Sequence, residues 1–435
     1  MRILRFSDPR FFSELARFIE TRNASAEVTD RVAAILAAVK AEGDAAVLRY
    51  TREFDGHRFE ASELRIDPAA LEKSARALSP RHRKAIEEAI HCVRTFHQQG
   101  LPQSWEAVNP HGARVGERWY PVRRVGLYVP AGSVPLVSTV VMTATLARLA
   151  GVPEIAVFSP PGRDGMICPP MLAAMHLCGV EEVYRLGGAQ AVGAMAYGTA
   201  TIPAVDKVFG PGNAYVTEAQ RQVFGTVGIE LLPGPSEALA IADETAEPAW
   251  LAADLLAQAE HGTGREKIYY VFTEDAQCAA VEAAIQAQLK TLKHAETIRT
   301  VLEKSTLFVQ VADLEEAVAV ANFVAPEHLE LHVDHNHFAK LEAAITTAGA
   351  MLFGHDTPTV LGDFTAGPSH TLPTGRTGRF FSGLKITDFF RRTSLVEYNR
   401  EALAKARDVV AVFSELEDLD AHGRSLEIRF EEPAP

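Results

Sequence analysis

Cysteine is scarce in this 435-residue chain, which contains four cysteines, Cys92, Cys168, Cys178 and Cys278. They lie far apart and none belongs to a C-x-x-C pair, so the sequence predicts neither a disulfide framework nor a thiolate zinc site. We expect buried, structural cysteines. A catalytic thiol is the alternative, but no neighbouring residue is of a type and spacing that activates one recognisably.

Long apolar runs and an excess of positive charge are also missing. The amino terminus lacks the apolar stretch of a secretory signal, and no segment reaches membrane-spanning length without a charge or a proline. The chain has 43 basic and 56 acidic residues and a net charge of -13, which disfavours nucleic-acid binding as its main function. We therefore expect a cytoplasmic protein whose partners include neither a membrane nor a nucleic acid.

The residues that are present indicate a globular α/β protein. A hydrophobic share of 47% with 23% charged residues is typical of soluble domains, and the length favours two large domains with small appendages. From residue 123 onward, short apolar strands alternate with helical segments, which predicts two Rossmann-like parallel-sheet domains of similar size. The first set of strands is expected at 125–129, 155–158, 183–186, 207–209 and 229–232. The second set is expected at 268–272, 307–311, 329–333 and 350–353, where 329–333 alternates like a half-buried strand.

We expect the chain to divide into four parts. Residues 1–24 form a short helical segment, and residues up to about 120 are mostly helical by apolar periodicity, with one helix expected over 28–50. A first, discontinuous α/β domain takes 25–127 and 238–384, and a second α/β domain, 128–237, is inserted in it. Residues 385–435 form a small tail domain.

Glycine-rich loops with polar residues follow the strands of the first set. Their polar residues are Tyr128, Gln190, Asn213 and Ser236. Ligands of parallel sheets bind beyond the carboxyl ends of the strands, where glycine lets the backbone approach a ligand closely. Each glycine pair alone is better explained as a turn, and none is a G-x-G-x-x-G fingerprint. Together they favour a ligand crevice without identifying its ligand.

Metal-ligand residue types are scattered over the second half of the chain. Gln258 and His261 lie three apart at the end of a helix expected over 248–259, so both point to one side and are able to hold one ion. If residues 258–261 are considered alone, a polar helix end is the simpler interpretation. The long polar loop 355–375 is typical of an ordered binding loop. The histidines of 334–337 fit a solvated turn better than a metal site.

A series of sequence blocks, taken together, resembles the histidinol dehydrogenase family over nearly the whole chain from about residue 25. The blocks are Gly126-Leu127-Tyr128-Val129-Pro130, Gly187-Gly188-Ala189-Gln190-Ala191, Gly210-Pro211-Gly212-Asn213, Gly234-Pro235-Ser236-Glu237, Gln258-Ala259-Glu260-His261, Ala325-Pro326-Glu327-His328-Leu329-Glu330, Gly362-Asp363 with Ala366-Gly367-Pro368 and His370, and Ala421-His422. One block alone is weak evidence, whereas all of them in the same order are highly specific.

The resemblance implies an enzyme that oxidises L-histidinol to L-histidine through L-histidinaldehyde with two NAD+ and a bound Zn2+. By motif, the zinc ligands are Gln258, His261, Asp363 and His422, a set of imidazole, carboxylate and amide donors that suits zinc. His328 takes the alcohol proton and Glu327 activates water against the aldehyde. Tyr128, Gln190 and Asn213 contact the dinucleotide. Substrate contacts are implied for Ser236, Gln258, His261, His328, Asp363, His370, Glu417 and His422.

The resemblance also implies a homodimer in which the carboxyl-terminal segment crosses to the partner, so that Glu417 and His422 complete the neighbouring site. Glu327 and His328 are adjacent and cannot share a strand face, so we expect them on a turn from which both reach the pocket. A loop salt bridge is the alternative for this pair.

Departures from the family pattern leave two other functions open. Pro233 stands where the family has alanine, Ser369 stands where it has asparagine, and 375–378 is a variant loop. These positions surround the pocket and put substrate identity in doubt more than the fold. A dehydrogenase of another polar primary alcohol is therefore one alternative, and an inactive metal-binding scaffold is the other. The intact metal set favours histidinol, and the presence of both Glu327 and His328 argues against a scaffold.

Overall fold

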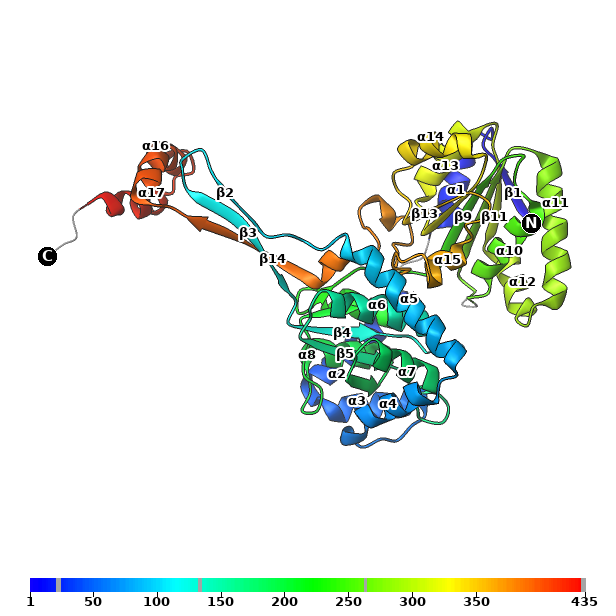
Figure 1. Cartoon of the computed structure of the whole chain (residues 1–435), viewed down its shortest axis with the longest axis horizontal. Helices are drawn as coiled ribbons and strands as arrows, with labels where there is room; N and C mark the ends of the chain where they lie inside the picture. Colours follow the sequence, from blue (N-terminus) through cyan, green and yellow to red (C-terminus); the bar gives the residue numbers. More distant parts are fainter. Residues whose placement is uncertain (21–24, 132–134, 262–263, 432–435) are drawn as a thin grey trace. The chain divides into compact units, whose positions relative to one another are not determined.

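The computed structural model describes residues 1–20, 25–131, 135–261 and 264–431. It divides into two compact units (Figure 1). The first unit comprises Met1–Gly100 and Val122–Phe389, and the second comprises Leu101–Pro121 and Phe390–Pro435. Across the ranges described, we find no helix that is both long and apolar enough to span a bilayer.

The first unit contains a six-stranded, fully parallel sheet of strand order β1-β11-β10-β9-β12-β13. Its strands are β1 (Arg2–Arg5), β9 (Glu237–Ala242), β10 (Lys267–Phe272), β11 (Thr306–Gln310), β12 (His328–His332) and β13 (Ala350–Phe353). One face packs on helices α1 (Phe11–Ile19), α13 (Leu314–Val324) and α14 (Phe338–Ala344). The other packs on α10 (Pro248–Ala259), α11 (Asp275–Gln288) and α12 (Ala295–Lys304).

A second parallel sheet of the same unit has the strand order β6-β5-β4-β7-β8. Its strands are β4 (Arg124–Tyr128), β5 (Glu154–Ser159), β6 (Glu182–Arg185), β7 (Lys207–Phe209) and β8 (Gly228–Ile229). Helices α2 (Ala26–Glu42), α3 (Asp44–Asp55), α8 (Gly188–Tyr197) and α9 (Ala214–Val223) share one apolar core with it. Helices α4 (Pro68–Ala77), α5 (Pro80–Gln98), α6 (Val137–Leu149) and α7 (Pro169–Leu177) pack on one another. The two predicted parallel sheets are confirmed, and both lie in the first compact unit.

The domain boundaries differ from those expected. Residues 25–127 were assigned to the domain of 238–384, but helices α2 to α5 pack around the five-stranded sheet instead. The reason is the apolar stripe of α2, including Val32, Leu36 and Val39, which is buried in the same core as the small side chains of α8. The segment 1–24 is not only helical, because its first residues form β1 beside β11 in the six-stranded sheet.

Three secondary-structure predictions also need correction. Strand β9 was missed because it follows directly on the turn residues of 234–236. Strand β12 was expected to be half-buried, but all its residues are buried because the sheet is covered on both faces. The helix expected from 28 to 50 is broken at Gly43, whose φ of 57° favours glycine, into α2 and α3.

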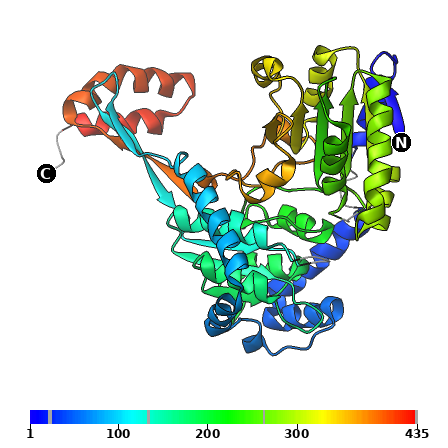
Figure 2. The ribbon, with the colours of Figure 1, turned by 45° about the vertical axis from the view of Figure 1, so that its right-hand side comes forward.

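The second unit is built on a three-stranded antiparallel sheet of order β14-β3-β2. Its strands are β2 (Trp105–Val108), β3 (Arg114–Pro121) and β14 (Phe390–Glu397), followed by helices α16 (Arg400–Leu416) and α17 (Asp420–Glu427). In Figure 2 the cyan β2–β3 hairpin runs alongside β14 toward these red helices. The tail domain expected at 385–435 therefore also includes 101–121, which pairs with it across a long separation in sequence.

Candidate active site

Strand β12 carries three polar side chains on one face of the six-stranded sheet. His328, Glu330 and His332 alternate with Leu329 and Leu331, so they point to the side opposite the core that holds the two leucines. Their neighbours on β9 are Ala238, Ala240 and Ala242. The small alanine side chains leave room for polar groups between the sheet and the helices that cover it.

His328, Asp363 and His370 converge at the amino end of β12. Asp363 lies in the short helix α15 (Thr359–Phe364), and its Oδ1 is 3.9 Å from His328 Nε2 and 3.9 Å from His370 Nδ1. His370 Nε2 is 3.3 Å from the hydroxyl of Thr139 in α6. Residues far apart in sequence thus reach one location.

The surroundings of this cluster shift its pKa values. Burial lowers the pKa of His328 to about 4, so its imidazole is neutral at pH 7. Burial, together with the nearby His328 and His261, lowers the pKa of His370 to about 4. Burial and the charge of Glu330 raise the pKa of Asp363 to about 6. The site therefore presents neutral imidazoles, the form in which histidine accepts a proton or binds a metal.

Glu237, the first residue of β9, and Glu327, the residue before β12, support His328. The amide of Glu237 donates to Glu327 Oε2 at 2.8 Å, and the amide of Gly375 donates to Glu237 Oε2 at 3.1 Å. His328 Nδ1 lies 3.3 Å from the carbonyl oxygen of Glu237. With the proton on Nδ1 donating to that carbonyl, Nε2 is left as the basic nitrogen on the side of Asp363.

The expected turn for Glu327 and His328 is corrected by this arrangement. His328 begins strand β12 and Glu327 directly precedes it. Both are buried, with exposed fractions of 7% for Glu327 and 5% for His328. Burial, with the charges of Glu237 and Asp363, raises the pKa of Glu327 well above its usual value. Hydrogen bonds to the backbone of Glu237 in β9 hold the pair, and Glu327 Oε2 lies 3.8 Å from His328 Nδ1.

Gln258 and His261 lie at the end of α10. Gln258 is 2% exposed, and its Oε1 is buried without a hydrogen-bond partner among the described residues. A buried amide oxygen left unpaired is costly, and coordination of a cation would satisfy it. Helix α10 ends at Ala259, so His261 lies in the following turn instead of on the helix face that we expected. The His261 side chain is exposed, yet desolvation by the atoms around it lowers its pKa.

The predicted dinucleotide residues lie at the carboxyl edge of the five-stranded sheet. Tyr128 ends β4, and its hydroxyl accepts a hydrogen bond from the amide of Gly188 at 3.1 Å. Gln190 is 1% exposed, and neither of its side-chain polar atoms has a partner in the described structure. Asn213 caps α9 by accepting from the amides of Tyr215 and Val216. The group at this edge that a ligand could still pair with is the buried side-chain amide of Gln190.

Gly210 shows how closely these loops pack. Its φ is 102°, and a Cβ at this position would lie 2.1 Å from the carbonyl oxygen of Tyr128. A side chain is thus excluded both by conformation and by space. The loop before Asn213 depends on glycine here.

Ser236 lies in the loop that follows β8 and leads into β9. It directly precedes β9 and is half-buried, so it lies at the amino edge of the six-stranded sheet, near Glu327 and His328.

The departures at Pro233 and Ser369 have local roles. The carbonyl of Pro233 accepts from the hydroxyl of Thr217, and Ser369 Oγ accepts from the amide of Thr371.

Comparison with known proteins supplies the family. Residues 19–430 match the family model described as histidinol dehydrogenase. The chain belongs to the histidinol dehydrogenase family.

Individual relatives agree with this assignment over nearly the full length. The chain is 43% identical over 428 residues to a histidinol dehydrogenase of Rhizobium meliloti (strain 1021), covering 98% of each chain. It is 44% identical to one of Cupriavidus pinatubonensis, covering 99% of this chain and 97% of the relative. A crystal structure of histidinol dehydrogenase from Elizabethkingia anophelis superposes with a TM-score of 0.92 at 30% identity, covering 99% of this chain and 98% of the other.

Glu417 and His422 belong to the second unit of this histidinol dehydrogenase family member. Glu417 caps α16 and His422 lies in α17, and both side chains are exposed. The structure describes each unit by itself, so the roles implied for these two residues stay predictions.

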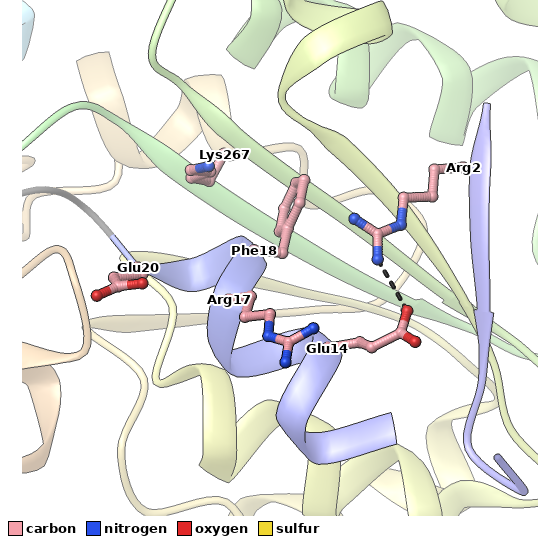
Figure 3. Close-up of a pocket in the computed structure, with 6 residues that line it drawn as sticks. All are labelled: Arg2, Glu14, Arg17, Phe18, Glu20 and Lys267. Atoms are coloured by element: carbon pink, nitrogen blue, oxygen red, sulfur yellow. Dashed lines mark hydrogen bonds and ion pairs between the residues drawn. The ribbon is translucent and has the colours of Figure 1, made fainter. Parts of the chain in front are cut away.

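A cavity of about 450 Å³ lies at the amino ends of β1 and β10 (Figure 3). Arg2 donates to Glu14 at 2.9 Å, and the ammonium of Lys267 lies 4.4 Å from the centre of the Phe18 ring. These groups are engaged with one another, so the cavity adds no group to the site described above.

A second polar cluster, formed by Asp254, Glu330 and His332, was not predicted from the sequence. Two of its members, Glu330 and His332, follow His328 at every second position, and this spacing places them on the same face of the strand. Asp254 gave no signal, because its approach to β12 depends on how α10 packs.

Proposed function

We propose that this protein oxidises L-histidinol to L-histidine through L-histidinaldehyde, using two NAD+ and a bound Zn2+. One observation supports this above all: His328, Asp363 and His370 meet within 4 Å contacts at the amino end of β12, although they come from three separate segments. The names of its relatives indicate the same substrate.

The donor set fits zinc. Gln258, His261 and Asp363, with His422, would hold the ion through one amide oxygen, two imidazoles and one carboxylate. The unpaired, buried Oε1 of Gln258 is the feature of the fold that favours this assignment. When bound, zinc acts mainly as a template for the imidazole and amine nitrogens of the substrate.

The residues of the chain account for the proton transfers. His328 Nε2 takes the hydroxyl proton of the alcohol as hydride leaves carbon for the first NAD+, which yields the aldehyde and NADH. Glu327 then takes one proton from a water molecule as the water oxygen adds to the aldehyde carbon. The hydrate anion transfers hydride to the second NAD+, which gives NADH and the carboxylic acid, and the acid loses its proton to solvent to give the carboxylate. Tyr128, Gln190 and Asn213 would contact the dinucleotide, and Ser236, His370 and Glu417 the substrate.

Replacing Asp363 with asparagine should remove the zinc of this site. Asparagine keeps the size of the side chain but lacks the negative charge, which is the largest charge in the donor set. Metal analysis of purified protein is expected to show one equivalent fewer per chain, and His261→Asn should behave in the same way. Asp356→Asn, an exposed change in the same loop, is the control and should leave the metal content unaltered.

The activity itself is tested by a steady-state assay. Two NADH per L-histidinol, lost on chelation and restored by Zn2+, would support the proposal. Turnover with a different polar primary alcohol alone would instead favour the related dehydrogenase, and tight zinc binding without turnover would favour a scaffold.

We further propose a homodimer in which each second unit completes the site of its partner. The exposed apolar side chains of α16, including Val409, Val412 and Phe413, support an interface with another chain. His422 would then act on the site that contains the partner's copies of Asp363 and His261.

Mixing two inactive variants tests this exchange. His328→Asn removes a residue of the first unit, and His422→Asn removes one of the second. After the subunits are exchanged, half of the dimers are mixed, and one of the two sites in each has both native residues. Activity should recover to about one quarter of the wild-type value. No recovery in a dimer proven to be mixed would mean that His422 acts within its own chain.

A further inference from the structure

We propose that Asp254, Glu330 and His332 bind a second divalent cation of the zinc type, at a site distinct from the one that includes Gln258, His261 and Asp363. One carboxylate comes from α10, and the other two groups come from β12. This proposal does not depend on the substrate of the enzyme.

The spacing of the three groups suits shared coordination. His332 Nε2 is 3.4 Å from Asp254 Oδ2 and 3.6 Å from Glu330 Oε2, and one ligand atom of each residue lies within 4.8 Å of the others. Direct N–H···O hydrogen bonds are shorter, about 2.7–3.2 Å. Ligands about 2.0–2.1 Å from a tetrahedral ion are about 3.4 Å apart, which matches the two distances to His332.

His332 provides an independent indication of a ligand. Its side chain is 1% exposed, and its Nε2 is buried without a hydrogen-bond partner in the ranges that the structure describes. This nitrogen faces both carboxylates. A buried nitrogen in this position is costly unless it binds something.

The charges of the cluster point in the same direction. Glu330 is 1% exposed and the Asp254 side chain 12% exposed, so two carboxyl groups, each negative when ionised, lie largely buried together. A protonated His332 would balance one of them, whereas a divalent cation balances both. Thr359 donates from its amide and hydroxyl to Glu330 Oε1, which leaves Oε2 directed toward His332.

The remaining coordination position has a candidate ligand. The ring centre of His355 lies 6.1 Å from that of His332, and its Nδ1 is buried without a partner in the described part of the chain. Water would serve equally. Asp254 is the least buried member, with 12% of its side chain exposed.

A cation here would also fix the elements that carry the first site. Asp254 lies one turn before Gln258 on α10, and Thr359, bonded to Glu330, lies one turn before Asp363 on α15. The second ion would therefore be structural, joining α10 to β12 and, through Glu330, to α15.

Metal content per chain tests the proposal on the full-length protein. Protein dialysed against buffer with micromolar Zn2+ should retain about two equivalents per chain. His332→Gln and Glu330→Gln should each remove one equivalent, and Asp363→Asn should remove the other. His97→Gln is the matched control, since His97 is also a buried histidine whose Nε2 lacks a partner among the described residues, and it should keep both.

The alternatives give different counts. A wild-type protein with one equivalent, lost in Asp363→Asn and kept in His332→Gln, would overturn the second site while the proposed zinc enzyme stands. If the wild-type protein holds one equivalent, and only His332→Gln and Glu330→Gln lose it, the second site is supported and the first is contradicted. If His332→Gln does not fold, the metal content of the wild-type protein and of Glu330→Gln decides between these alternatives.

Discussion

Replacing His328 with asparagine is expected to lower kcat for L-histidinol by about 10²–10⁴-fold, the usual contribution of a general base. Asparagine is able to donate to the carbonyl of Glu237, as Nδ1 of His328 does, but it offers no basic nitrogen toward Asp363. The proton of the alcohol then has no acceptor as hydride leaves. The fold and the zinc content should remain near normal, because His328 is not among the proposed zinc ligands.

The pKa of His328 makes this prediction specific. Burial lowers it to about 4, so the imidazole is unprotonated throughout the neutral range and is available as a base without prior loss of a proton. A buffer base such as imidazole should partly restore the rate of the variant if the missing function is proton transfer.

Initial-rate measurements with saturating NAD+ provide the test, alongside metal analysis of the same samples. His335→Asn is a suitable control, because His335 is an exposed histidine beyond the end of the same strand. A His328→Asn variant with wild-type kcat would show that another group takes the proton.

The strands were largely predictable from the sequence, whereas the packing of the helices was not. Short apolar runs bounded by glycine or proline marked β4, β5, β7 and β10 nearly to the residue, because parallel strands buried on both faces have little freedom in composition. The assignment of α2 to α5 to a sheet failed, because a helical stripe such as Val32 and Val39 indicates that a face is buried but not against what. The β2–β3 hairpin was missed for a similar reason: its partner β14 is far away in the chain.

The site shows the same division between local and long-range information. The sequence blocks marked Glu327, His328 and Asp363 individually, and in the fold His328 lies close to both carboxyl groups. The hydrogen bonds that hold Glu327 to β9 were not foreseeable, because β9 itself was hidden behind turn residues. Asp254 was missed because a lone aspartate on an amphipathic helix is usually a solvated residue, and only the packing of α10 on β12 brings it to His332.

Replacing Glu327 with glutamine is expected to impair the second oxidation far more than the first. Glutamine keeps an oxygen that accepts from the amide of Glu237, so the local structure should persist, but it cannot take a proton from water. Oxidation of supplied L-histidinaldehyde should fall by about 10²-fold or more, and the NADH formed per L-histidinol in a single turnover should drop from two toward one.

The pH dependence of aldehyde oxidation gives this prediction a second, independent readout. Glu327 acts as a base only when ionised, and burial with the charges of Glu237 and Asp363 raises its pKa well above the usual carboxyl value. The active fraction therefore grows with rising pH above the usual carboxyl range, and the wild-type rate should rise with it. Glu327→Gln should lose this rise because glutamine does not titrate, whereas Glu342→Gln, an exposed change, should keep it. An unchanged pH profile in Glu327→Gln, with aldehyde oxidation at the wild-type rate, would assign water activation to another residue.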